Sequence, residues 1–222
     1  MYFDCTLNGN RVRTSASRAY RDPLRRGNFC GTARQKIAWP IFLESDFMNF
    51  EKRVFSSIPQ VAEVLMLPPT AKRGLFEEGV PDYFFYRGYS ADPGLTVISR
   101  AAGAPIVRFG SDGAGLIGVE SVSGCVVRIS GRTEEQCLVN VTVGCFTETA
   151  RILTQRFPYY SDDTEIGEIE AAAEELRNIV RSVDPQAVVP GSYWAELIDE
   201  VDGLLFDAED VRAWYRRRNH PP

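Results

Sequence analysis

The hydrophobic pattern of this 222-residue chain changes period near residue 141, and this change constrains its fold most. Before it, short runs rich in β-branched and aromatic residues alternate with Gly, Pro, Asp and Ser, which is typical of strands and turns. The connections are too short for parallel crossovers, so the runs predict an antiparallel meander of about five to six strands. The predicted strands are 83–87, 96–99, 106–109, 116–120, 125–129 and 138–141.

After residue 141 the apolar residues recur at helical spacing. The first stripe begins at Phe146, and the second runs from Ile166 to Val183 at intervals of three and four residues, with Asp184 and Pro185 ending that helix. A third helix is predicted at 194–205. Strands followed by helices predict an α+β domain in which helices pack on one antiparallel sheet. We expect a single domain at 48–208, because a chain of this length has room for one well-buried core.

Residues 1–47 differ from the rest, because they are rich in Arg, Ser and Gly and show no sustained period. We interpret them as a basic, disordered extension, or as a misassigned start of translation upstream of Met48. A basic arm that touches nucleic acid or a partner is the alternative. Residues 209–222 form a polar tail. Between these ends, Thr70 is a candidate N-cap of a short helix, and Gly79 is expected to end it as a C-cap in the left-handed helical conformation, with Pro81 two residues beyond.

The charge is distributed unevenly along the chain. Residues 1–47 hold eight Lys/Arg against four Asp/Glu, a net charge of +4, whereas the whole chain has −5, which leaves −9 for the remainder. Direct nucleic-acid binding needs clustered Lys/Arg, so we do not expect it from the acidic body. Such a body suits a basic protein partner, although acidity also simply keeps a protein soluble.

Membrane and redox signals favour a cytoplasmic protein. No run of eighteen apolar residues predicts a membrane span, and the N-terminus lacks the order of a secretory signal. The five cysteines are Cys5, Cys30, Cys125, Cys137 and Cys145, an odd number without a C-x-x-C pair. We therefore expect free, half-buried thiols in a reducing compartment.

The chain does not predict catalysis, a cofactor or a metal. Gly113 to Gly118 matches G-x-G-x-x-G, but a strand-like run follows in place of the helix that would receive a pyrophosphate, so we interpret hairpin turns. The single histidine, His220, lies between Asn and Pro near the end, which leaves a Ser-His or Cys-His nucleophile without a plausible base. Paired carboxylates such as Glu134 and Glu135 are interpreted as solvated faces.

Asn140, Val141 and Thr142 form a glycosylation sequon that means little without a secretion signal. Thr142 stands where strand gives way to helix, so it is a candidate N-cap, and Asn140 is expected to hydrogen-bond at the same junction. We interpret both residues as architectural.

Five features occur in an order that is typical of one family. They are a Gly-Val-Pro turn at 79–81, a Gly-Asp-containing hairpin leading to an apolar strand at 109–119, a turn and Val-rich strand at 123–129, the block from Val139 to Phe146, and a late helix with Trp194. On these features residues 48 to about 205 resemble the fourth subgroup of the SUKH superfamily of bacterial toxin-immunity proteins, relatives of the yeast Smi/Knr regulators. Val141 and Val143 depart from the family's block, which leaves the fold intact but puts partner specificity in doubt.

The resemblance implies an immunity protein, without enzymatic activity, that binds and neutralises a cognate toxin, with nuclease and deaminase domains among the toxins such proteins oppose. An acidic face would mimic phosphate toward a basic toxin cleft. The candidate partner-binding residues are Asp162, Asp163, Glu165, Glu168, Asp199, Glu200 and Asp202, and the candidate structural residues are Gly79, Pro81, Asn140, Thr142, Phe146 and Trp194.

Two other classes compete with immunity. One is a regulatory protein-interaction module of the same fold with no toxin partner. The other is a hydrolase or nucleotide-binding enzyme, which a thermal-shift panel with nucleotides and metals would detect, because a ligand that binds only the native state raises the melting temperature. The sequence alone leaves the toxin's identity and the oligomeric state open.

Overall fold

A computed structural model describes residues 50–56, 62–100, 103–157, 159, 164 and 166–203. The segments predicted at 1–47 and 209–222 lie outside these residues. Within them the chain forms a six-stranded antiparallel sheet in the order β3-β4-β5-β6-β7-β8, so each strand pairs with its neighbour in sequence. The predicted α+β class and antiparallel meander are therefore confirmed.

The strands of this sheet vary in length. They are β3 (Tyr83–Phe84), β4 (Tyr89–Ile98), β5 (Ile106–Asp112), β6 (Gly115–Glu120), β7 (Val126–Ser130) and β8 (Gln136–Asn140). A separate small sheet pairs β1 (Lys52–Arg53) with β2 (Val80–Pro81). The hairpin predicted near Gly113 is confirmed, because Asp112 pairs with Gly115 across a two-residue turn.

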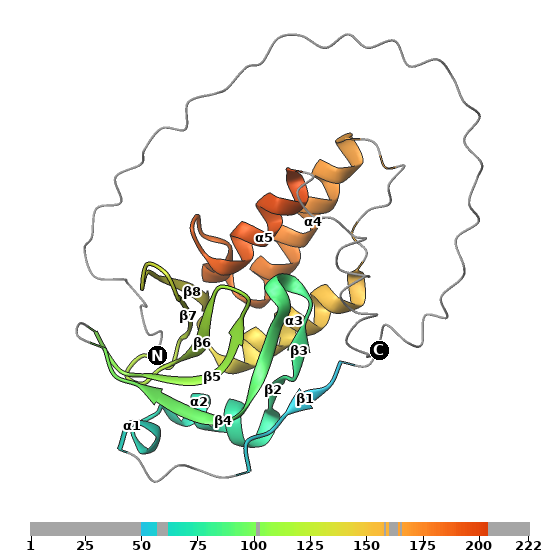
Figure 1. Cartoon of the computed structure of the whole chain (residues 1–222). Coiled ribbons are helices and arrows are strands. Elements are labelled where there is room, and N and C mark those ends of the chain that lie inside the picture. The colour runs from blue at the N-terminus through green and yellow to red at the C-terminus, as the bar shows by residue number, and fades with distance from the viewer. Residues whose placement is uncertain are drawn as a thin grey trace, which may run out of the picture.

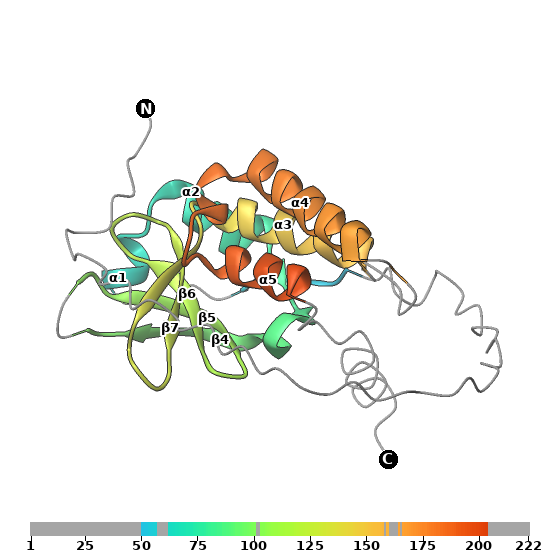
Figure 2. The same ribbon diagram turned by 90° about the horizontal axis from the view of Figure 1, so that it is seen from above.

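Helices cover one face of this sheet (Figures 1 and 2). The long ones are α3 (Val143–Arg156), α4 (Ile166–Val183) and α5 (Tyr193–Asp202). Shorter ones are α1 (Ala62–Leu65), α2 (Pro69–Arg73), the π-helical turn η1 (Gly74–Glu78) and the 3₁₀ turns η2 (Tyr86–Gly88) and η3 (Pro185–Val188). The stripe predicted for 166–183 forms, with Ile169, Ala173, Leu176 and Val180 buried. No helix within the described ranges is long and apolar enough to cross a membrane.

Alternation along the strands divides the apolar residues between two faces of the sheet. Val107 and Phe109 of β5 point into the main core under the helices, together with Phe146 of α3 and Trp194 of α5. Ile106 belongs to a smaller cluster with Cys125, Val127 and Ile129. The helices therefore rest on the face that carries the aromatic residues.

Two local predictions were wrong. Thr70 does not cap α2, because Pro68 is the N-cap and Pro69 occupies the first turn, where its missing N–H costs nothing. The strand predicted at 83–87 ends at Phe84, since the chain turns through η2 and Arg87 has φ 53°. β4 then runs longer than predicted and contains an irregularity between Ala91 and Thr96.

The cysteines also differ from expectation at one position. Cys137 and Cys145 are free and half-buried, and burial raises the pKa of both thiols. Cys125 is disulfide-bonded, which corrects the prediction of free thiols there. Spacing in the sequence does not show which distant residues meet, so it gave no sign of this bond.

Candidate functional site

The structure separates the predicted acidic residues into three groups. Asp162, Asp163 and Glu165 lie outside the described residues. Glu168 is exposed in the first turn of α4, and Asp199 and Asp202 are exposed on α5. Glu200 is half-buried and engaged with its neighbours. The assignment of these residues to a binding surface stays a prediction.

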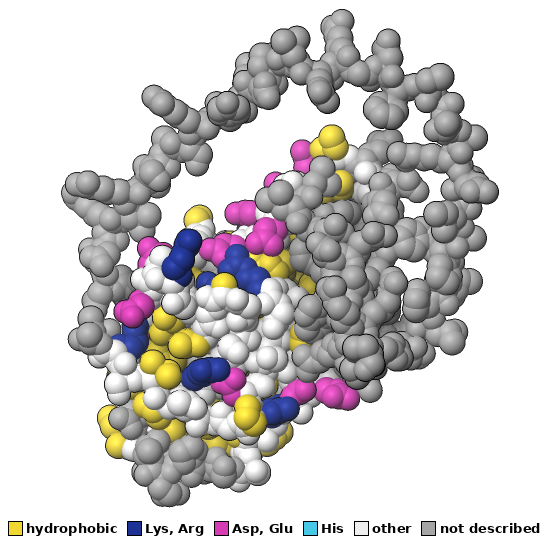
Figure 3. All heavy atoms as spheres, viewed as in Figure 1, with side chains coloured by type: hydrophobic (Ala, Val, Ile, Leu, Met, Phe, Trp, Pro, Cys, Tyr) yellow, Lys and Arg dark blue, Asp and Glu magenta, His cyan; other side chains and the backbone are white. Residues whose placement is uncertain are grey.

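Helices α4 and α5 pack against each other and form the most acidic part of the described chain. Together they contain eight Asp/Glu and two Arg, a net charge of −6. Arg177 of α4 links the helices, with its Nε 3.4 Å from Glu174 and its Nη2 3.4 Å from Asp199. In Figure 3 acidic side chains gather around basic ones in the region of α5.

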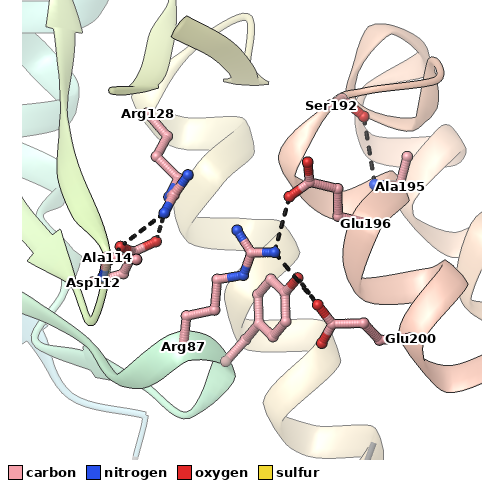
Figure 4. Close-up of polar contacts among 9 residues, drawn as sticks. Arg87, Asp112, Ala114, Arg128, Ser192, Ala195, Glu196 and Glu200 are labelled. Atoms are coloured by element: carbon pink, nitrogen blue, oxygen red, sulfur yellow. Dashed lines mark hydrogen bonds and ion pairs between the residues drawn. The ribbon is translucent and has the colours of Figure 1, made fainter. Parts of the chain in front are cut away.

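An arginine from the turn before β4 bridges to α5 (Figure 4). Nη2 of Arg87 lies 3.0 Å from Oε2 of Glu196 and 3.3 Å from Oε1 of Glu200. The side chains of Arg87, Glu196 and Glu200 are 27%, 41% and 34% exposed, so water reaches all three. We call these three residues the seam. Spacing of four residues places the two glutamates on one face of α5.

Two tyrosine rings form the floor of the seam. The Arg87 guanidinium carbon lies 5.0 Å from the ring centre of Tyr86 and 5.9 Å from that of Tyr193, within the range of cation–π attraction. The Tyr86 hydroxyl donates a hydrogen bond of 3.0 Å to Glu200. Burial raises the pKa of Tyr86, and the carboxylates of Glu200 and Glu196 raise it further, so the hydroxyl remains a donor.

A buried ion pair shapes the hairpin that supports Arg87. Nε of Arg128 on β7 donates to Oδ2 of Asp112 at 2.5 Å, and the Asp112 side chain is fully buried. Oδ1 of Asp112 accepts the N–H of Ala114, which tightens the turn. The N–H of Gly113 then donates to the carbonyl of Arg87 at 2.7 Å. The hairpin therefore fixes the backbone from which the seam arginine projects.

A second network, made of buried and half-buried hydrogen bonds, holds the start of α5 against β8. Asp184 accepts hydrogen bonds from Asn140 Nδ2 at 3.1 Å, Val141 N at 2.8 Å and Gln186 N at 3.1 Å. Oδ1 of Asn140 accepts the indole N–H of Trp194 at 2.8 Å. Asn140, Asp184 and Trp194 are almost completely buried. We call these three residues the inner anchor, which joins β8, η3 and α5.

Other residues singled out in the sequence have clear local roles. Thr142 caps α3, since its hydroxyl accepts the N–H of Cys145 at 3.0 Å. Phe146 lies in the core against Trp194 and Phe109. Gly79 ends the helical turn with φ 82° and ψ 159°, an extended form of positive φ in place of the left-handed helical one expected. Its carbonyl accepts from Thr147 at 3.0 Å, and Pro81 is buried in β2.

Comparison with known families matches the SUKH-4 immunity protein family model to residues 47–200. The chain belongs to the SUKH-4 immunity protein family. The search of curated proteins and the search of solved structures return no match. The family match spans every element of the sheet, the inner anchor and the seam.

Sequence reasoning missed several polar residues of this SUKH-4 protein. Arg87 was placed within a strand, and Asp184 was interpreted only as a helix end. The pairing of Asp112 with Arg128 was also missed, although each residue gave a signal. An aspartate before a Gly-Ala turn is typical of a tightened turn, and an arginine inside an apolar strand needs a buried counter-charge.

The SUKH-4 structure also shows where the three glycines of the G-x-G-x-x-G motif lie. Gly113 lies in the β5–β6 turn, and Gly115 and Gly118 lie in β6, which continues as a strand. The helix N-terminus that a dinucleotide site requires does not follow these glycines. Among the described residues, no group of three or more His, Cys, Asp or Glu is arranged to hold a metal ion.

Proposed function

We propose that this protein neutralises a cognate bacterial toxin by binding it directly, without catalysis. The observation that carries the proposal is the SUKH-4 immunity family match over residues 47–200. Neutralisation by binding needs a surface that complements the toxin and blocks its active site. We place the protein in the cytoplasm, where thiols are kept reduced; the free thiols of Cys137 and Cys145 suit that compartment, whereas the disulfide at Cys125 does not. Mass spectrometry of Cys125 in protein isolated under thiol-trapping conditions tests this placement, which a persistent disulfide there would contradict.

The acidic surface of α4 and α5 supports this proposal. With a net charge of −6 on two adjacent helices, it would attract a basic cleft and speed association. Toxins that act on nucleic acid, such as nucleases and deaminases, need a basic cleft to bind phosphate. The proposed contact residues are those predicted from sequence: Asp162, Asp163, Glu165, Glu168, Asp199, Glu200 and Asp202.

Co-expression tests the proposal directly. The full chain is produced with the toxin domain encoded beside its gene, and the two outcomes measured are a stable complex and rescue of growth. A complex with rescue supports immunity by binding. The absence of both would contradict the proposal and favour the regulatory module without a toxin partner.

Charge reversal tests the surface. We expect Glu168→Lys with Asp202→Lys to slow association with the toxin by about tenfold at low salt, because electrostatic steering is lost. The matched control reverses two exposed glutamates away from α4 and α5, Glu77 and Glu134, and changes the net charge equally. Stopped-flow measurements give the association rate of each double variant with the toxin. Equal slowing in both would show that only the net charge matters.

A further inference from the structure

The two carboxylates of the seam share one nitrogen. Oε2 of Glu196 and Oε1 of Glu200 both lie within 3.3 Å of Nη2 of Arg87. Among the residues that the structure describes, the second oxygen of each carboxylate accepts no hydrogen bond. Each glutamate therefore keeps an acceptor available on a partly exposed surface.

The charges of the seam do not balance. Two carboxylates and one guanidinium leave a net charge of −1, so one further cation would complete the group. Because a single nitrogen already reaches both carboxylates, an ammonium or a guanidinium from outside is large enough to bridge them as well. The geometry and the charge thus favour the same kind of ligand, a basic side chain.

The aromatic floor adds a second, independent observation. The hydroxyl of Tyr193 is buried and has no hydrogen-bond partner in the part of the chain that the structure describes. Its ring lies 5.0 Å from the edge-packed ring of Trp194 and beneath the Arg87 guanidinium. Buried polar atoms are normally paired, so the unpaired hydroxyl beside Arg87, Tyr86 and Asp112 indicates that the polar groups of this region are not all satisfied within the chain. Both tyrosine rings are buried beneath Arg87, so they hold its guanidinium in place between the two glutamates.

We propose that the seam binds a lysine or arginine side chain on the surface of the toxin and is the anchor of the complex, an inference that rests on the proposed function. Arg87 acts as a positioning residue. It holds Glu196 and Glu200 in place before binding, which reduces the side-chain entropy lost in the complex. Its own backbone is fixed by the hydrogen bond from Gly113.

The test removes two charges at the seam and two on the neighbouring helix α4. The seam variant is Glu196→Gln with Glu200→Gln, and the control is Glu170→Gln with Glu174→Gln, both at exposed positions of α4. The two variants have the same net charge, so long-range attraction falls equally. We expect the seam variant to raise the dissociation constant about tenfold more than the control, through a faster dissociation rate.

Binding of the full chain to the toxin domain encoded beside the gene is measured by surface plasmon resonance, and melting temperature is measured in parallel. A faster dissociation with an unchanged melting temperature supports the seam as the anchor. Equal dissociation constants for the two variants overturn this inference and leave immunity standing. Absence of binding by the unmodified chain overturns the proposed function and the inference together.

Discussion

The inner anchor and the seam both attach α5 to the rest of the molecule, but they differ in their contact with water. Asn140, Asp184 and Trp194 are at most 1% exposed, and every described hydrogen bond of the group is made within the chain. The seam side chains are about a quarter to two-fifths exposed and keep free acceptors. A closed polar network specifies a fold, whereas a half-solvated one adds little stability and can take a new partner.

Asp184→Ala should produce the largest effect, because it breaks the inner anchor. The side-chain N–H of Asn140 would lose its acceptor while buried, and the backbone N–H groups of Val141 and Gln186 would lose theirs in half-buried positions. At about 1–3 kcal/mol for each unpaired group, partly relieved by relaxation, we expect a loss of about 4 kcal/mol in the free energy of unfolding. Urea denaturation measures it.

The matched control is Asp199→Ala, the same substitution at an exposed position of α5. We expect a change within about 0.5 kcal/mol, as for surface substitutions in general. Similar losses for the two variants would show that burial of the inner anchor does not set its contribution.

Arg87 allows a sharper comparison, because its φ of 53° lies where glycine is favoured over other residues. Arg87→Ala should cost about 1 kcal/mol through the loss of half-exposed ion pairs and ring contacts. Arg87→Gly loses the same contacts but relieves the backbone, so it should be more stable than the alanine variant by about 1 kcal/mol. Both are measured by urea denaturation.

Arg177 provides the control with the opposite sign. It is a similarly exposed arginine that pairs with acids, but it lies within α4, where glycine destabilises the helix. There the glycine variant should be about 1 kcal/mol less stable than the alanine variant. The same order at both positions would contradict the backbone geometry assigned to Arg87.

The sequence could predict features that depend on neighbouring residues, but not contacts between residues far apart in the chain. Strand and helix periods follow from residues close in the chain, so the meander, the stripe of α4 and the cap at Thr142 were accessible. Asn140 and Trp194 were both singled out from the sequence, yet Asn140 also bonds to Asp184, which lies 44 residues away from it. Contacts of that kind depend on how elements pack, which no local pattern specifies.

The seam was harder to predict for the same reason. Glu200 was named as a candidate contact, but only as one member of an acidic helix face. Arg87, 113 residues away, was taken for a strand residue because its neighbours Tyr83 to Tyr86 are aromatic. Tertiary structure overrode that local preference, since the β5–β6 turn holds the Arg87 carbonyl.

A more exposed ion pair should contribute less to stability than either the inner anchor or the seam. Glu148 and Arg151, one turn apart on α3, have side chains 45% and 35% exposed, so screening by water keeps their contribution to about 0.3–0.5 kcal/mol. The hydrogen bond from Arg151 lowers the pKa of Glu148 below 4.5, against a smaller opposing effect of burial. Because the folded pKa is lowered, this stability is present above 4.5 and is lost as pH falls through the folded pKa.

Glu148→Gln tests this sign. The variant should be less stable than the unmodified chain by about 0.3–0.5 kcal/mol at pH 7, and the difference should shrink as the carboxylate of the unmodified chain is protonated in acid. Urea denaturation of both proteins from pH 7 down to pH values below 4.5, at low and at high salt, measures it. A difference that stays constant across this range would mean that Glu148 contributes to stability through packing and not through its charge. The Glu148–Arg151 pair could then no longer serve as the electrostatic reference for the less exposed seam.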